Sequence, residues 1–348
     1  MKFFTKSTTT VSFDLRHHQP KLIGLMKRLR SMVFFLLSVL ILSFLGVDWM
    51  ADKLIKPPRR DLQDYHREIL ANARDHGMRI EAFDVRGTPC LLCEPLIEPG
   101  AALKGNKLRL ELLAQGLALA PWGEIKATLV LMHGHKGRKE DHLPVAERFC
   151  AAGFRCLLID LPGHGQNPQT FASFGKTECV LPDHVLDAAS RQFDFTPQPA
   201  GLFGISQGGA IALQAAALNE KQWFAVAELA GFASLDQVIT RQAKSLFGPL
   251  ASAADWSVAS LVEQRAGFAP KDIRPVAAAA KLTIPVLIGH GDADDFVTPD
   301  QAKALLAAVP STRKQFLNVP GAGHSNMLVT PAPVYATLSR FFLEALPR

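Results

Sequence analysis

The sequence predicts an α/β protein built on a doubly wound, mostly parallel sheet. Short apolar runs with few charges occur at 127–132, 154–159, 200–205, 224–230 and 284–290. Such runs predict strands that are buried on both faces, as in a parallel sheet. Helix-like stretches at 141–152, 183–193, 207–218 and 299–308 alternate with them. This alternation favours helices on both sides of the sheet.

The chain begins with a basic tail, residues 1–31, and an apolar segment, residues 32–50. The tail holds seven basic residues and one acidic residue, so it carries the whole formal net charge of +6. Because the rest of the chain has no net charge, no nucleic-acid partner is predicted. The stretch from Met32 to Val47 contains no charge, and a spanning helix needs about 20 apolar residues. We predict an uncleaved transmembrane signal anchor at 32–50, because no small-residue cleavage site follows it.

The residues around this segment leave two alternatives to an uncleaved anchor, and they also indicate its orientation in the membrane. A cleaved signal peptide is the first alternative, and translation from Met26 is the second, since a compact basic and apolar region follows it. Basic residues flank the segment equally, but those on its N-terminal side lie closer to it. We therefore expect a cytoplasmic N-terminus, a single membrane pass and a catalytic domain on the exported side.

A globular domain is expected from residue 78 to residue 348, after a linker and juxtamembrane helix at 51–77. The segments 78–85 and 107–115 alternate apolar and polar residues, which predicts two strands at an antiparallel edge. About fifty residues with helical character lie between the strands at 224–230 and 284–290. We interpret 233–281 as a small helical lid. Its apolar residues favour a hydrophobic acyl substrate, or they form the core of the lid itself.

The cysteines and the clustered histidines do not predict a metal or cofactor site. The chain has five cysteines, and the odd number argues against a disulfide framework. Cys90 and Cys93 would point to opposite faces of one strand, so we interpret them as buried apolar residues. His133, His135, His142 and His164 are close in sequence, but they lack the spacing of known zinc hydrolases.

Ser206 is the candidate nucleophile. Gly204 and Gly208 flank it, each two residues away, in the segment GISQG. The serine directly follows the apolar run 200–205 and directly precedes the helix-like stretch 207–218. This is the context of a nucleophile elbow, a sharp turn that exposes the serine above the sheet. A helix-capping serine is the alternative, but it does not account for the two glycines.

A serine nucleophile needs a base, which a third group must orient. Two histidines follow Ser206 in the chain. His290 ends a predicted strand and favours a structural role, whereas His324 lies on a loop after the predicted strand 313–319. We therefore predict that His324 is the base. The candidates for the orienting acid all follow the strand at 284–290, and the residues alone leave the choice open: Asp292, Asp294 and Asp295.

From about residue 126 to residue 346 the chain resembles the α/β-hydrolase superfamily. The resemblance rests on H-G after the first core strand, D-x-x-G-H-G, G-x-S-x-G, H-G-x-x-D and a late G-x-G-H. The segment 272–299 is similar to the Bem46/ABHD-like and serine-aminopeptidase-like branches. The resemblance implies an α/β-hydrolase fold with Asp294 as the acid. It also implies an oxyanion hole formed by the main-chain N–H groups of His135 and Gln207, and it implies no cofactor. Asp160, Gly163, His164 and Gly165 are expected to shape a loop.

Three hypotheses about function follow. The first is a membrane-anchored serine hydrolase that cleaves a small-molecule carboxylic ester, or another acyl substrate, through Ser206, His324 and Asp294. The second is a peptidase, amidase or acyltransferase that uses the same three residues. The third is a non-catalytic binding protein with this fold, which a broken triad would favour.

Overall fold

The computed structural model describes residues 19–347. The chain divides into two compact units between Trp49 and Met50, and each is described by itself. Helix α1 (Gln19–Ile55) starts in the first unit. Its stretch from Met26 to Ile55 is long and apolar enough to cross a membrane. The last residues of α1, from Met50 onward, belong to the second unit. Most of the predicted basic tail, residues 1–18, lies outside the described residues.

The second unit contains one sheet of eight strands in the order β1-β2-β4-β3-β5-β6-β7-β8. The pairs β1–β2 and β2–β4 are antiparallel, and all other neighbours are parallel. The sheet therefore confirms the predicted α/β class. The strands are β1 (Met78–Val85), β2 (Thr88–Pro95), β3 (Ala127–Met132), β4 (Phe154–Ile159), β5 (Ala200–Ile205), β6 (Val226–Leu229), β7 (Val286–Gly291) and β8 (Lys314–Val319).

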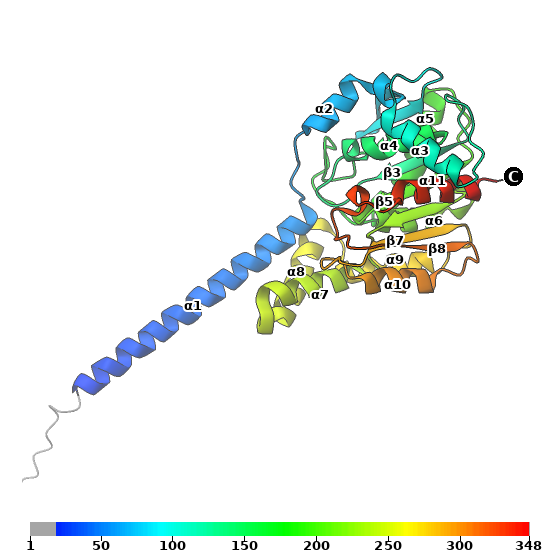
Figure 1. Ribbon diagram of the computed structural model, residues 1–348. Helices are drawn as coiled ribbons and strands as arrows, with labels where there is room; N and C mark the ends of the chain where they lie inside the picture. The colour runs from blue at the N-terminus through cyan, green and yellow to red at the C-terminus, as the bar shows by residue number, and fades with distance from the viewer. Residues whose placement is uncertain (1–18, 348) are drawn as a thin grey trace, which may run out of the picture. The chain divides into compact units, whose positions relative to one another are not determined.

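Helices cover both faces of this sheet. The helices of the second unit are α2 (Asp64–Ala71), α3 (Leu103–Ala114), α4 (Leu143–Ala151), α5 (Leu181–Gln192), α6 (Gln207–Leu218), α7 (Leu235–Phe247), α8 (Ala251–Ala266), α9 (Pro275–Ala279), α10 (Pro299–Ala308) and α11 (Val334–Ala345). Figure 1 shows α3, α4 and α11 together on one side of the sheet. Helices α5, α6, α9 and α10 contribute to the core on the opposite face.

Alternate strand residues supply these two cores. Leu129 and Leu131 of β3 belong to the core with α3, α4 and α11, whereas Val130 and Met132 belong to the other. This alternation is the pleat of a strand that is covered on both faces, and it explains why β3 is apolar throughout.

The edge of the sheet beside β1 differs from the prediction in one segment and agrees with it in another. The predicted strand at 107–115 is wrong, because these residues lie in α3. Gly105, Leu108 and Leu112 are its buried residues, a helical spacing that the alternation of the segment concealed. The antiparallel partner of β1 is instead β2. Within β2, Cys90 and Cys93 are buried free thiols in opposite cores, as predicted.

The segment 51–77, predicted to be a linker, packs closely within the second unit. Ala51 and Ile55 have no exposed surface, and Ile69 is almost completely buried. Helix α2 lies in this segment, close to where a juxtamembrane helix was expected. The burial of these residues means that much of 51–77 is part of the folded unit.

Candidate active site

Ser206 lies in a tight turn between β5 and α6. Its backbone has φ 52° and ψ −116°, a conformation that a residue with a side chain rarely adopts. The Ser206 N–H donates to the carbonyl oxygen of Leu229 at 2.7 Å, which fixes the turn against the end of β6. Strain of this kind persists only where surrounding contacts impose it, and here it projects the hydroxyl above the sheet.

Gly204 and Gly208 allow this turn by close approach of the backbone. A Cβ at Gly204 would lie 2.1 Å from the carbonyl oxygen of Gly208. A Cβ at Gly208 would lie 2.0 Å from the carbonyl oxygen of Met132, on the adjacent strand β3. No side chain fits at either distance, so both positions require glycine.

The structure brings His324 into contact with Ser206. Ser206 Oγ lies 2.9 Å from His324 Nε2, although 118 positions separate the two residues in the chain. His324 is on the loop between β8 and α11, and its side chain keeps 20% of its surface exposed. The ring of Phe296 lies 5.0 Å from that of His324, centroid to centroid.

Asp294 lies on the other side of the imidazole. His324 Nδ1 is 2.7 Å from Asp294 Oδ2. Because a carboxylate only accepts, Nδ1 carries the proton, and Nε2 is left as the acceptor for the Ser206 hydroxyl. The other carboxylate oxygen, Oδ1, accepts the main-chain N–H groups of Phe296 and Val297 at 3.0 and 2.9 Å.

The environment of Asp294 keeps its carboxylate charged. Burial alone would raise its pKa, but hydrogen bonds from His290 and His324 outweigh that effect and hold the pKa of Asp294 well below its usual range. The neighbouring carboxylates are placed differently. Asp292 is exposed and accepts the N–H of Gly321, and Asp295 is exposed. The residues alone left three candidates open, and the family resemblance implied Asp294. Of the three, Asp294 is the one that contacts His324.

The loop between β3 and α4, residues 133–142, passes directly beside Ser206. A Cβ at Gly134 would lie 3.4 Å from Ser206 Cβ, and the Gly137 N–H closes a turn on the Gly134 carbonyl. His135 is within this turn. Gln207 is the first residue of α6, so its main-chain N–H has no acceptor inside the helix. Both residues of the predicted oxyanion hole are therefore close to Ser206 in the structure.

Two of the clustered histidines, His133 and His135, form hydrogen bonds with the main chain. His133 Nδ1 donates to the Gly134 carbonyl, and its Nε2 accepts the Leu161 N–H. Burial lowers the pKa of both His133 and His135 to about 4, so both rings are neutral at neutral pH. Within the described part of the chain, no group of His, Cys, Asp or Glu is arranged to hold a metal ion.

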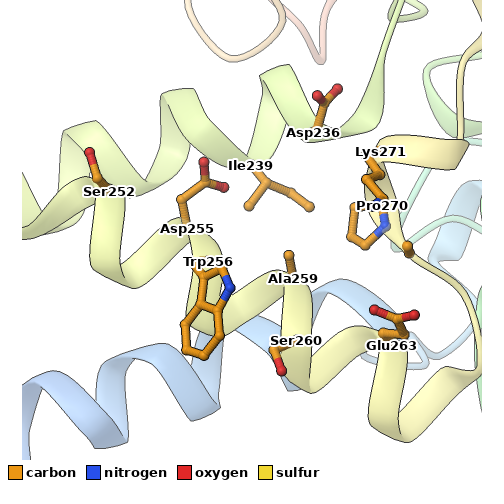
Figure 2. A pocket seen from close by; sticks show the side chains of 11 residues that line it. Asp236, Ile239, Ser252, Asp255, Trp256, Ala259, Ser260, Glu263, Pro270 and Lys271 are labelled. Atoms are coloured by element: carbon orange, nitrogen blue, oxygen red, sulfur yellow. The ribbon is translucent and has the colours of Figure 1, made fainter.

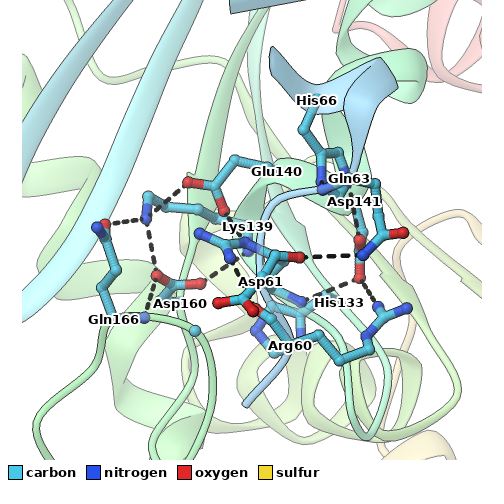
Figure 3. Close-up of polar contacts among 12 residues, drawn as sticks. Arg60, Asp61, Gln63, His66, His133, Lys139, Glu140, Asp141, Asp160 and Gln166 are labelled. Carbon is cyan, nitrogen blue, oxygen red and sulfur yellow. Dashed lines mark hydrogen bonds and ion pairs between the residues drawn. The ribbon is translucent and has the colours of Figure 1, made fainter.

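The loop after β4 is organised by Asp160. This buried carboxylate accepts the main-chain N–H of Lys139, the Lys139 ammonium and the N–H of Gln166, each within 2.9 Å. A Cβ at Gly165 would lie 2.1 Å from Asp160 Oδ1, which explains the glycine there. Figure 3 shows Asp160, Lys139 and Gln166 in this arrangement.

A model of the alpha/beta hydrolase family matches residues 129–337, more than half of the chain. The chain belongs to the alpha/beta hydrolase family. It is 28% identical over 258 residues to the "Uncharacterized 31.7 kDa protein in traX-finO intergenic region" of Escherichia coli, covering 61% of this chain and 89% of that one.

Two solved structures show the same fold at low sequence identity. An esterase of Pyrococcus furiosus matches with a TM-score of 0.60 and 12% identity, over 85% of this chain and 99% of that one. A membrane phospholipase A, described as a novel bacterial virulence factor, matches with a TM-score of 0.52 and 17% identity, over 89% of this chain and 98% of that one.

Two buried ionisable residues of this hydrolase-family chain, Glu228 and His290, lie close to the candidate site. Glu228 of β6 is fully buried, and its Oε2 accepts the Gly231 N–H at 2.7 Å. His290 Nε2 donates to the Val297 carbonyl at 2.8 Å and lies 3.2 Å from Asp294 Oδ2. Among the described residues, no hydrogen-bond partner faces Glu228 Oε1 or His290 Nδ1. The position of His290 at the end of a predicted strand indicated its structural role, whereas no motif in the sequence marks Glu228.

Helices α7 and α8 occupy the segment predicted as a lid, and two hollows lie along them. Figure 2 shows the first, of about 390 Å³, with Asp236, Asp255 and Glu263 around it. Neither Ser206 nor His324 lines it. The second, of about 760 Å³, is lined by Arg241 and Lys244 of α7 and by Phe296, whose ring neighbours His324. The second hollow therefore adjoins the candidate site.

Proposed function

We propose that this protein is a serine hydrolase that cleaves a carboxylic ester through Ser206, His324 and Asp294. The observation that carries the proposal is the continuous hydrogen-bonded chain from Ser206 Oγ to His324 at 2.9 Å and from His324 to Asp294 at 2.7 Å. A serine at a strained elbow, an imidazole within hydrogen-bond distance of it and a buried carboxylate are the parts that acyl transfer to serine requires.

The proposed reaction proceeds in two halves. Ser206 Oγ attacks the acyl carbon while its proton passes to His324 Nε2, and Asp294 stabilises the resulting imidazolium. The main-chain N–H groups of His135 and Gln207 stabilise the oxyanion. The tetrahedral intermediate expels the alcohol, which takes the proton from His324. Water then gives a proton to His324 and attacks the acyl-enzyme, and collapse of the second intermediate releases the acid and returns the proton to Ser206.

The test uses the full-length protein in detergent. Wild-type protein should react covalently with a fluorophosphonate probe and hydrolyse chromogenic acyl esters. Ser206→Ala should lose labelling and at least about three orders of magnitude in kcat/KM, because removal of a triad member has that effect. Ser190→Ala removes an exposed hydroxyl on α5 and should keep both activities. A folded Ser206→Ala protein that remains active would contradict the proposal.

The finer alternatives concern the acyl donor and acceptor. The same residues would serve a peptidase, an amidase or an acyltransferase, and the esterase and phospholipase A among the structural neighbours favour esters as the first substrates to test. Product analysis in mixtures of water and an alcohol separates hydrolysis from transfer. A non-catalytic binding protein would fail to react with the probe at all.

We further propose that α1 anchors the protein in a membrane by a single pass, with the catalytic unit on the exported side. The length and apolar character of Met26–Ile55 support an anchor. Protease added to one side of sealed membrane vesicles tests the orientation. Degradation of the catalytic unit only from the cytoplasmic side would contradict it.

A further inference from the structure

The end of the proposed membrane helix and the residues that follow it contact the active-site loop. We name residues 50–60 the juxtamembrane strap; all of them belong to the catalytic unit. Ala51 and Ile55 of the strap are completely buried. The strap therefore has a fixed place in the catalytic unit, rather than the freedom of a linker.

The end of α1 accepts hydrogen bonds from the catalytic unit. The last four carbonyl groups of a helix have no partner within it. Two of these, at Leu54 and Ile55, accept from outside: His135 Nε2 donates to the Leu54 carbonyl at 2.9 Å, and the Ala172 N–H donates to the Ile55 carbonyl at 2.9 Å. Because a carbonyl only accepts, the neutral His135 ring carries its proton on Nε2.

Arg60 holds the next residue of the same loop. Its Nε donates to the Lys136 carbonyl at 2.7 Å, and its guanidinium also pairs with Asp141. Lys136 has φ 65°, an unfavourable conformation for a residue with a side chain, so it needs contacts that impose it. In the opposite direction, the Arg138 guanidinium of the loop donates to the Arg60 carbonyl at 2.8 Å. Figure 3 shows Arg60 and Asp141 next to one another.

Both contacts hold the chain immediately after one main-chain N–H, that of His135. His135 is held through its ring by Leu54, and the following residue is held through its carbonyl by Arg60. The His135 N–H is the group that we assigned to the oxyanion. We propose that two residues of the juxtamembrane strap, Leu54 through its carbonyl and Arg60 through its side chain, position the oxyanion hole, with Arg60 as the principal side chain. This inference rests on the proposed function.

The consequence concerns the rate of the chemical step. An oxyanion donor stabilises charge that develops in the transition state, so its displacement lowers kcat more than it changes substrate binding. Complete loss of one such donor costs about 100- to 1000-fold in kcat, and a displaced donor should cost less. Arg60→Ala should therefore lower kcat by about ten- to a hundred-fold while KM stays within about two-fold.

The experiment compares Arg60→Ala, Arg60→Lys and Arg59→Ala in the full-length protein. Arg59 belongs to the same strap but donates to the Gly165 and Gln169 carbonyls, on a different loop. Arg59→Ala should keep wild-type kcat, and Arg60→Lys should recover part of the loss, because an ammonium can still donate to the Lys136 carbonyl. Melting temperatures should fall equally in the two alanine variants.

A second variant tests the other contact. In the wild-type protein the His135 ring stacks on that of Phe174, with 5.7 Å between the centroids. His135→Phe keeps a ring that can stack there but removes the hydrogen bond to the Leu54 carbonyl. It should lower kcat, and its effect should be less than additive with that of Arg60→Ala. Equal kcat values for Arg60→Ala and Arg59→Ala, in a protein that Ser206→Ala inactivates, would overturn this inference alone. Activity that survives Ser206→Ala would overturn the proposed function itself.

Discussion

His324 Nδ1 lies 2.7 Å from Asp294 Oδ2, a buried carboxylate whose other oxygen accepts two main-chain N–H groups. The main-chain bonds fix the carboxylate, and the carboxylate in turn fixes the tautomer of the imidazole. Asp294 thus links the loop after β7 to the loop after β8 at the point where Ser206 projects from the sheet.

Asp294→Asn should keep most of the stability of the protein and lose about three to four orders of magnitude in kcat. The amide can still accept the two main-chain N–H groups, but it disfavours the histidine tautomer that accepts from serine and leaves the imidazolium without a counter-charge. Measured kcat/KM and melting temperature check this, with Asp292→Asn and Asp295→Asn as matched controls. If either control loses activity while Asp294→Asn keeps it, the assignment of the acid is wrong.

Gly208→Ala should destabilise the protein at or beyond the upper end of the range of about 1–3 kcal/mol for overpacking, because the added Cβ would meet the Met132 carbonyl at 2.0 Å. Main-chain atoms cannot rotate away as a side chain can. The free energy of unfolding, or the soluble yield, measures the effect. Gly323→Ala is the control, since the nearest atoms to a Cβ there are 3.8 Å away. Equal stability of the two variants would refute this explanation of the glycine.

Glu228→Gln should stabilise the protein more at pH 8 than at pH 5. Burial raises the pKa of Glu228 to about 7, although His290 and the Gly231 N–H oppose the shift. A folded-state pKa above the unfolded value means that the stability contributed by this group is present below about pH 4 and is lost as the pH rises through about 7. The glutamine does not ionise and avoids that loss.

Thermal unfolding of wild type and Glu228→Gln between pH 5 and pH 8 measures this difference. Glu98→Gln, at an exposed carboxylate, is the control and should show no growing difference. If the difference in melting temperature between Glu228→Gln and wild type does not change with pH, Glu228 does not titrate in this range.

Much of the fold could be predicted from the sequence because the signals are local. A strand covered on both faces must be apolar throughout, and the stretches at 127–132, 154–159 and 200–205 meet that condition; each is a strand with the predicted bounds. The elbow is equally local, since the contacts that exclude a Cβ at Gly204 arise within a few residues of Ser206. Residues close together in the sequence are therefore enough to predict these features.

Tertiary structure decided the features whose partners are distant in the chain. Alternation in 107–115 suits a strand, but the buried face of α3 selects the helix. Three aspartates follow β7 within four positions, and only the path of the loop determines that Asp294 meets His324. Leu54 and Arg60 carry no local pattern that points to the oxyanion loop, since their partners are about 80 positions away. A sequence specifies short-range geometry directly, whereas contacts between distant segments exist only after packing has brought those segments together.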